Sequence, residues 1–195
     1  MRTIGIYGGS FNPIHVGHIA LARSLVARGL VDEVWLMVSP CNPLKAQSGL
    51  APDHWRLRLA QAAVSDVEGV CASDFEFALP RPSYTYDTLK ALERAHPDCR
   101  FALLIGADNW QVFDRWAHHD RLLSEHDIFI YPRPDCPIDA ASLPSRIHLL
   151  ADVPQFDVSA TDLRRRIAAG QDVSLWMPPA AHRLLIADNP YRKEG

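Results

Sequence analysis

Short apolar runs alternate along the chain with longer stretches in which apolar residues recur every three or four positions. Runs rich in β-branched and aromatic residues predict strands, and the longer period predicts amphipathic helices. The expected strands are Thr3–Tyr7, Glu33–Val38, Val70–Ala72, Phe101–Ile105, Ile128–Tyr131 and Ile147–Leu149. The expected helices are 18–28, 52–64, 85–95, 159–169 and 179–187. This alternation is typical of βαβ units around a parallel sheet.

Capping residues support several of the helix boundaries. Gly29 and Gly170 each follow a predicted helix, where glycine favours the left-handed turn that ends it. Ser159 is the expected N-cap of the helix 159–169, and Asp162 three residues later comes close to a capping box. The helix 52–64 carries an apolar stripe made of Trp55, Leu59, Ala62 and Ala63.

The order of the elements predicts a single α/β domain over residues 1–195. We expect a doubly wound, Rossmann-like parallel sheet with helices on both faces over about residues 1–150, and a C-terminal helical part over about 151–195. Loops are expected at 41–51, 79–83 and 132–144, which are rich in proline. In an open α/β sheet, ligands bind in loops at the carboxyl ends of the strands.

Composition excludes two classes of partner. The apolar stretches, such as Phe101–Ile105, are far shorter than the roughly 20 residues of a membrane span. The start of the sequence enters a strand without a signal-peptide layout, so we expect a cytoplasmic protein. The net charge of −3 argues against broad binding of nucleic acid.

Cysteine spacing and surface pattern add little chemistry. The four cysteines form no CxxC pair, which argues against a zinc framework or a redox motif and leaves idle thiols as the expectation. No interface pattern stands out, so homo-oligomerisation stays open.

The stretch GGSFNPIHVGH, residues 8–18, joins the first strand to the first helix. Such a junction aims backbone N–H groups and the positive end of the helix dipole at one point, which is an anion site. We expect Gly8 and Gly9 to let the chain turn sharply and the Ser10 hydroxyl to donate to a phosphate oxygen. His15 and His18, three residues apart, share one face of the first helical turn.

Three other interpretations of this stretch are weaker. A dinucleotide fingerprint needs GxGxxG, whereas the spacing here is GGSFNP. Zinc binding by His15 and His18 needs a third ligand and gains nothing from the glycines. Both histidines could also simply cap the helix and pack. Phosphate binding is favoured because imidazole offers an N–H donor whose charge adapts near neutral pH.

The stretch resembles the GG(T/S)F(D/N)PxHxGH signature of the nucleotidylyltransferase superfamily and, within it, the nicotinate-nucleotide adenylyltransferases. Ser10 and Asn12 stand where threonine and aspartate are commoner. Further matching motifs follow in the family's order: Asn42-Pro43-Leu44-Lys45, Ser83-Tyr84-Thr85 with Asp87-Thr88-Leu89, Gly106-Ala107-Asp108-Asn109 with Trp116, and Val158 to Arg164.

The resemblance implies adenylyl transfer from ATP to nicotinate mononucleotide, which yields deamido-NAD and pyrophosphate. The mononucleotide phosphate would attack the α-phosphorus directly, without a covalent intermediate. Mg²⁺ would arrive with ATP, and we expect no protein metal site. Catalysis would rest on positioning and electrostatic stabilisation.

The resemblance also assigns ATP-side residues. His18 would contact the α-phosphate in the transition state and His15 the neighbouring phosphates. Arg164 would hold the β and γ phosphates, helped by Ser159 and Thr161. Asp108 would accept from a ribose hydroxyl, with a helix N-cap as its alternative role. The remaining ATP-binding residues are Gly8, Gly9, Ser10, Phe11 and Gly106.

On the acceptor side, the resemblance implies that Lys45 and Asn42 lie near the mononucleotide, where Lys45 could also be a solvated loop residue. Trp116 would stack on the pyridine ring, unless it is a core residue. Backbone N–H groups around Thr85 and Ala117 would receive the nicotinate carboxylate. Ser83 and Tyr84 complete the expected acceptor site.

Other polar residues are ambiguous in the sequence. Arg133 is either an ATP-side residue or a surface arginine. Arg165 and Arg166 are expected on a solvated helix face, and His118 and His119 at a helix start rather than in a metal site.

Two rival functions remain open. The acceptor could be nicotinamide mononucleotide or phosphopantetheine, because sequence does not reveal which groups face the ring substituent. The chain could also be a nucleotide-binding module without turnover, against which His15, His18 and Arg164 argue.

Overall fold

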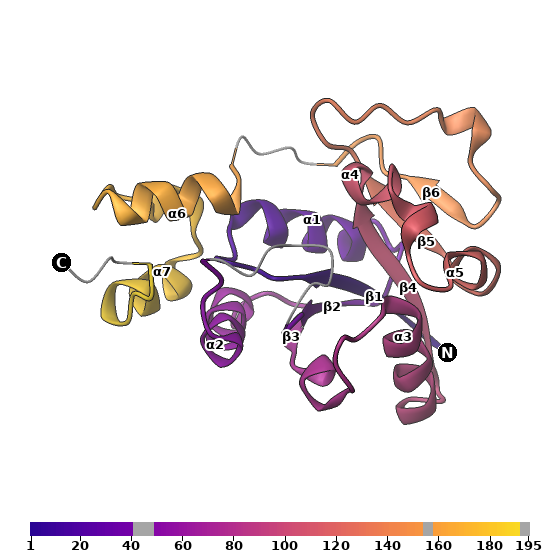
Figure 1. The fold of residues 1–195 in the computed structure, drawn as a ribbon, viewed down its shortest axis with the longest axis horizontal. Coiled ribbons are helices and arrows are strands. Elements are labelled where there is room, and N and C mark those ends of the chain that lie inside the picture. Colours follow the sequence, from indigo (N-terminus) through magenta and orange to yellow (C-terminus); the bar gives the residue numbers. More distant parts are fainter. Residues whose placement is uncertain (41–48, 154–157, 192–195) are drawn as a thin grey trace.

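Six parallel strands form one sheet in the order β3-β2-β1-β4-β5-β6 (Figure 1). The computed structural model describes residues 1–40, 49–153 and 158–191. The strands are β1 Arg2–Gly9, β2 Glu33–Val38, β3 Val70–Ser73, β4 Cys99–Gly106, β5 Ile128–Tyr131 and β6 Ile147–Leu149. The predicted doubly wound sheet is confirmed, and each predicted strand is found, with β1, β3 and β4 longer than expected.

Helices cover both faces of the sheet. They are α1 Val16–Ala27, α2 Asp53–Val64, α3 Thr85–Ala95, α4 Ala107–Trp110, α5 His119–Glu125, α6 Ala160–Ala168 and α7 Pro179–Ala187. Single 3₁₀ turns occur at Phe75–Ala78 (η1), Phe113–Arg115 (η2), Ala140–Ser142 (η3) and Ser174–Trp176 (η4). Within the described ranges, no helix is long and apolar enough to cross a membrane.

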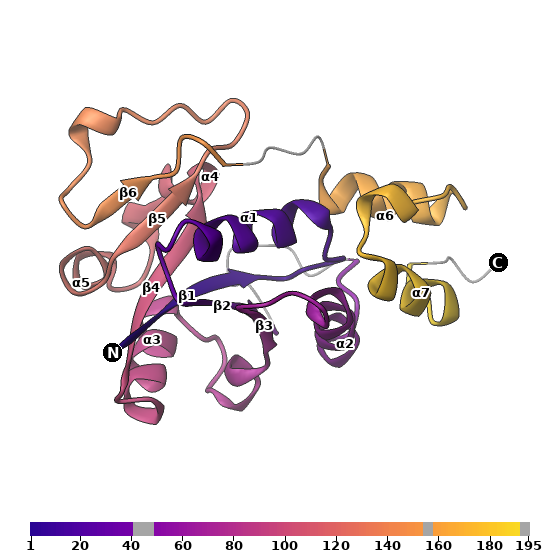
Figure 2. The ribbon, with the colours of Figure 1, turned by 180° about the vertical axis from the view of Figure 1, so that it is seen from behind.

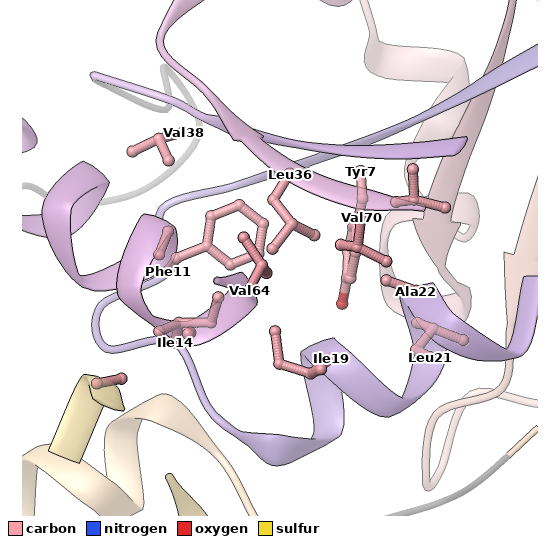
Figure 3. Close-up of a cluster of buried hydrophobic side chains, with 14 of the residues drawn as sticks. Tyr7, Phe11, Ile14, Ile19, Leu21, Ala22, Leu36, Val38, Val64 and Val70 are labelled. Atoms are coloured by element: carbon pink, nitrogen blue, oxygen red, sulfur yellow. The ribbon is translucent and has the colours of Figure 1, made fainter. Parts of the chain in front are cut away.

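Alternation along the strands assigns each helix to a face. On β4, Phe101, Leu103 and Ile105 enter the core that α3 and α5 cover, whereas Ala102 and Leu104 enter the core that α1 and α2 cover. Figure 3 shows the second core, where Phe11 and Ile14 point to the same cluster as Leu36 and Ile19. Both faces of the sheet are therefore buried, as a parallel sheet requires.

The two C-terminal helices extend the core of α1 and α2. Leu163 and Ile167 of α6 and Ala181 and Leu185 of α7 are buried in that cluster. Both helices lie at the end of the molecule opposite β6, with α6 beside the start of α1 and α7 beside α2 (Figures 1 and 2). This arrangement brings α6 close to the loop that follows β1.

The chain reverses its direction across the sheet between β1 and β4. After β1 it moves outward through β2 and β3, then returns so that β4 pairs with β1 on the other side. The loops after these two strands consequently diverge to opposite faces and leave a crevice at their carboxyl ends. The GGSFNP segment and the Gly106-Ala107-Asp108 segment both lie at this point.

The expectation that Gly8 and Gly9 make the turn after β1 is wrong. Both are the last residues of the strand and pair with Met37 and Val38 of β2. The left-handed residue is Phe11, at φ 43°. A Cβ on Gly9 would lie 3.1 Å from the Phe11 ring, so Gly9 provides room for that ring rather than a turn.

Arg56 of α2 anchors the loops at this edge of the sheet. Its side chain is fully buried, and Nη1 donates to the backbone oxygens of Ser10 at 2.6 Å and Ser39 at 2.9 Å. Nε donates to the oxygen of Ala51 at 2.9 Å, and Nη2 to that of Pro40 at 3.4 Å. One guanidinium therefore ties the loop after β1 to the segments that follow β2 and precede α2.

Replacing Arg56 should destabilise the fold strongly. Arg56→Met keeps much of the apolar stem but leaves buried carbonyl oxygens without donors, so we expect a loss of about 3 kcal/mol in the free energy of unfolding. Urea denaturation measures it. The control is Arg58→Met on the same helix, where the side chain is half-exposed and lies 3.6 Å from Asp188, and the expected change is under about 0.5 kcal/mol. Equal effects of the two substitutions would contradict the role given to Arg56.

Candidate functional site

The start of α1 brings the two histidines of the loop into contact. His15 is the N-cap of the helix and His18 the third helical residue. The His15 backbone N–H donates to Nδ1 of His18 at 3.2 Å, and the ring centroids are 3.6 Å apart. The predicted pairing of the imidazoles on one helical turn is confirmed, and the capping role is found as well, because the two residues form a reciprocal capping box.

The two rings differ in what they can do. Burial, reinforced by the positive charge of Arg133, lowers the pKa of His15 to about 4, so this imidazole is neutral near pH 7. Because Nδ1 of His18 accepts a backbone hydrogen bond, a neutral His18 carries its proton on Nε2. The loop thus offers imidazole N–H donors without stacking two positive charges.

The histidines line the first of two adjoining pockets at the carboxyl ends of the strands, a hollow of about 540 Å³. It lies on the α1 side of the sheet, and its other walls include Tyr7, Tyr131 and Arg133. Arg133 Nη2 donates to the Tyr131 hydroxyl at 3.0 Å, and the guanidinium lies 4.9 Å from the centre of that ring. The guanidinium also lies 3.7 Å from the Asp108 carboxylate. Arg133 is therefore held at the pocket wall with its charge facing the phosphate loop.

The second pocket, of about 730 Å³, borders the first along the end of β1. Both pockets include Tyr7 and Tyr131 in their walls, and the Tyr7 hydroxyl donates to that of Tyr131 at 3.2 Å. The second pocket is also lined by Trp116 and by Thr85, the first residue of α3. The first N–H groups of a helix lack partners within it, so this helix end favours an anion.

Glu76 contributes a carboxyl group to the second pocket. The residue is buried, and the Thr88 hydroxyl donates to its Oε1 at 3.0 Å. Burial raises the pKa of Glu76, while hydrogen bonds from the hydroxyls of Ser39, Thr88 and Ser83 act in the opposite direction. The carboxyl group thus joins the end of β2 to the segment that begins α3.

Arg164 approaches the phosphate loop from α6. Its Nη1 donates to the backbone oxygen of Asn12 at 2.8 Å, and Nη2 donates to Thr161 Oγ1 at 3.2 Å. Both partners are uncharged, so the guanidinium keeps its full charge for an anionic ligand. Ser159 is the N-cap of α6, as predicted, and its Oγ accepts from the Asp162 N–H at 3.0 Å.

Two buried nitrogen atoms without a hydrogen-bond partner mark the two pockets. They are Nδ1 of His15 in the first and Nε1 of Trp116 in the second. Across the parts of the chain that the structure describes, the remaining buried side-chain atom of this kind is Nε2 of His126. Buried polar atoms are normally paired, so Nε1 of Trp116 points to a group that a ligand supplies. Nδ1 of His15 also faces the backbone N–H of His18 in the capping box, without a hydrogen bond of good geometry.

The structure places the other predicted ATP-side residues around the end of β1. Gly8, Gly9, Ser10 and Gly106 line the second pocket, whereas the Phe11 side chain is buried in the core. A Cβ on Gly106 would lie 3.1 Å from the Tyr131 ring and closer still to the Asp108 carboxylate, which explains a glycine there. Gly106, rather than Asp108, is the N-cap of α4, so the alternative role given to Asp108 is wrong.

The predicted acceptor residues are only partly brought together. Thr85 and Trp116 line the second pocket, and Ser83 reaches it through Glu76. Tyr84 is the N-cap of α3 and is 41% exposed. Asn42 and Lys45 lie outside the described residues.

Several ambiguous side chains have structural roles. Asp162 forms ion pairs with Arg165 and Arg166 instead of closing a capping box. His118 and His119 start α5, as expected, and Cys71, Cys99 and Cys136 are free thiols. Among the described residues, no three histidine, cysteine or acidic side chains gather as metal ligands.

Sequence reasoning missed Arg56, Glu76 and Tyr131. Arg56 had a signal: on α2 it lies three residues before Leu59, on the stripe predicted to be buried. Glu76 and Tyr131 had none, because their partners Thr88 and Tyr7 come from distant segments.

Comparisons with known proteins agree with this geometry. The cytidylyltransferase-like family model matches residues 6–166. A Bacteroides fragilis protein named probable nicotinate-nucleotide adenylyltransferase is 48% identical over 182 residues, which cover 93% of this chain and 90% of that protein. A Porphyromonas gingivalis protein of the same name is 41% identical, with coverages of 94% and 93%.

A solved structure shares the fold. Plasmodium falciparum nicotinic acid mononucleotide adenylyltransferase complexed with NaAD superposes with a TM-score of 0.81 at 22% identity, and the match covers 98% of each chain.

The pH dependence of stability tests the buried state of His15. Because its pKa falls from 6.5 to about 4 on folding, its stabilising contribution is complete above about pH 6.5 and is lost as the pH falls towards 4. The stability lost between pH 7 and pH 4, measured by urea denaturation, should be about 3 kcal/mol smaller in His15→Asn than in the wild type. The control is the same substitution at the exposed His54, which should leave the wild-type dependence in place. A pH dependence unchanged by His15→Asn would show that this ring is not held neutral.

Proposed function

The chain belongs to the nicotinate-nucleotide adenylyltransferase family, and we propose that it uses its two pockets to join ATP to nicotinate mononucleotide in NAD biosynthesis. It is a nucleotidyltransferase. The observation that carries the assignment is the pair of unpartnered nitrogens, at His15 in one pocket and Trp116 in the other. Two ligands that meet along the end of β1 would lie against both rings.

The reaction needs no nucleophilic side chain. A phosphate oxygen of the mononucleotide attacks the α-phosphorus of ATP, a new P–O bond forms, and the bond to the β-phosphate oxygen breaks to release pyrophosphate. The attacking oxygen is already ionised at neutral pH, so no general base is required. The barrier comes from bringing two anions together and from charge on the transferring group, which positioned donors offset.

The first pocket is assigned to the ATP phosphates. His18 would donate from Nε2–H to the α-phosphate in the transition state, and the neutral His15 would donate to a neighbouring phosphate. Arg164 would hold the β and γ phosphates, with Ser159 and Thr161 at the start of α6. The position of Arg133 beside both histidines supports an ATP-side role for it as well. Gly8, Gly9, Ser10 and Gly106 line the second pocket, where it borders the first, and their role toward ATP stays a prediction, as do those of Phe11 and Asp108.

The second pocket is assigned to the mononucleotide. Trp116 would stack on the pyridine ring, and the free N–H groups at the start of α3, around Thr85, would receive the nicotinate carboxylate. The positive end of the helix dipole supports an acid rather than an amide at this place. Ser83, Tyr84, Asn42 and Lys45 stay predictions as acceptor residues.

Several further predictions are part of the same proposal. Mg²⁺ would enter on the triphosphate as part of the substrate, because this ion keeps several of its waters and is held mainly by phosphate oxygens. Cytoplasmic location, a single domain with a C-terminal helical part, and self-association stay predictions from the sequence.

One observation favours nicotinamide mononucleotide as the acceptor instead. Glu76 places a carboxyl group in the second pocket, where it could accept from the amide of that ligand. This carboxyl group already accepts hydrogen bonds from the hydroxyls of Ser39, Thr88 and Ser83, which weakens the alternative.

Pyrophosphate release decides between these acceptors. Purified protein is mixed with ATP, Mg²⁺ and nicotinate mononucleotide, nicotinamide mononucleotide or phosphopantetheine. We expect the highest kcat/KM with the nicotinate compound. A strong preference for the amide would overturn the acceptor assignment, and tight ATP binding without turnover on any acceptor would indicate a nucleotide-binding module.

Removing the His18 imidazole should slow the chemical step. His18→Ala deletes a donor to the transition state, so we expect kcat to fall about 100-fold or more with little change in stability. The control is His148→Ala, at an exposed imidazole on the edge strand β6, 3.5 Å from Asp127. A near-normal kcat for His18→Ala would remove this residue from the mechanism.

A further inference from the structure

Asn12 connects the phosphate loop to three other parts of the chain. The residue is buried, and its Nδ2 donates to the backbone oxygen of Gly49 at 2.9 Å while Oδ1 accepts from the Ala51 N–H at 3.1 Å. Its own backbone oxygen accepts from Arg164 Nη1. Because each end of the amide has a different partner, the orientation of the Asn12 side chain is fixed.

Tyr191 reaches the same amide from the C-terminal end of the chain. Its hydroxyl donates to Asn12 Oδ1 at 2.6 Å, across a separation of 179 residues. Burial raises the pKa of Tyr191, and the positive charges of Arg164 and Arg56 act in the opposite direction. The hydroxyl keeps its proton near pH 7 and acts as a donor.

The Tyr191 ring and the segment before it make further contacts that do not involve the hydroxyl. Its ring packs edge-on against Trp55 of α2, with centroids 5.5 Å apart. Trp55 Nε1 also donates to the backbone oxygen of Asp188 at 3.0 Å, just after α7. Tyr191 and the segment after α7 are thus attached to α2 by contacts that a phenylalanine at position 191 would preserve. The hydroxyl donates to the phosphate loop.

We propose that Tyr191 is a positioning residue for adenylyl transfer and that it acts through Asn12 on Arg164. With its amide held by Gly49, Ala51 and Tyr191, Asn12 keeps the backbone oxygen that fixes the Arg164 guanidinium. The inference rests on the proposed function, because that function assigns Arg164 to the β and γ phosphates. Without the hydroxyl, Asn12 gains freedom and Arg164 samples positions away from the phosphates.

A double-mutant cycle between Tyr191 and Asn12 tests whether Tyr191 acts on Arg164 through Asn12. Tyr191→Phe removes one hydrogen bond, so we expect kcat/KM for Mg-ATP to fall about fivefold to tenfold. In an Asn12→Ala background the same substitution should change kcat/KM less than about twofold, because the path is already broken. Should Asn12→Ala fail to fold, Arg164→Ala replaces it as the background, since it removes the other end of the path.

A matched control separates this effect from a general loss of a tyrosine hydroxyl. Tyr86→Phe removes a hydroxyl that donates to Glu125 Oε1 at 3.1 Å, between α3 and α5, and should leave kcat/KM for Mg-ATP at the wild-type value. An unchanged kcat/KM in Tyr191→Phe would refute the proposal. An equal loss in the wild-type and Asn12→Ala backgrounds would do the same, because it would indicate a role independent of Asn12.

Failure of the proposed function is distinguishable from failure of this inference. If the wild type releases no pyrophosphate with any mononucleotide, the proposed function fails. The cycle is then measured on the Kd for Mg-ATP by calorimetry. Tyr191→Phe should raise this Kd about fivefold to tenfold in the wild type and less than about twofold in the Asn12→Ala background. If the wild type turns over and Tyr191→Phe equals it, only the inference fails.

Discussion

The buried guanidinium of Arg56 is the interaction on which the edge of the sheet depends. A charge without water must be met by oxygen atoms, and here those atoms are the carbonyls of Ser10, Ser39, Pro40 and Ala51. Satisfying one charge therefore brings three chain segments together. The imidazoles of the phosphate loop, the end of β2 and the start of α2 are placed as a consequence.

Around this edge of the sheet, permanent positive charges and uncharged donors come from different residues. Desolvation and Arg133 keep His15 neutral, so two rings with centroids 3.6 Å apart need not share two positive charges. Permanent charge comes instead from Arg133 at the pocket wall and from Arg164 on α6. Fixed charge at the periphery and neutral N–H donors at the centre suit a reaction in which a second anion must approach the first.

The sequence predicts the fold well because the period of apolar residues is a local signal. The bounds of β2, β5, β6, α3 and α7 are as predicted, and the reversal between β1 and β4 follows from the order of the elements. The prediction fails where conformation depends on distant atoms. Gly9 is a strand residue that makes room for Phe11, and nothing local indicates that Phe11 supplies the turn. Likewise, the pairing of Glu76 with Thr88 and of Asn12 with Tyr191 exists only after the chain has folded.

Nitrogen chemical shifts test the central claim, that each pocket has its own ligand, most directly. Protein labelled with ¹⁵N in histidine and tryptophan is titrated with an ATP analogue that has a methylene group between its α and β phosphates, and separately with nicotinate mononucleotide. We expect the analogue to shift the ring nitrogens of His15 and His18, and the mononucleotide to shift Nε1 of Trp116. A mononucleotide that shifts the imidazoles and leaves Trp116 unmoved, or an analogue that does the reverse, would contradict this claim.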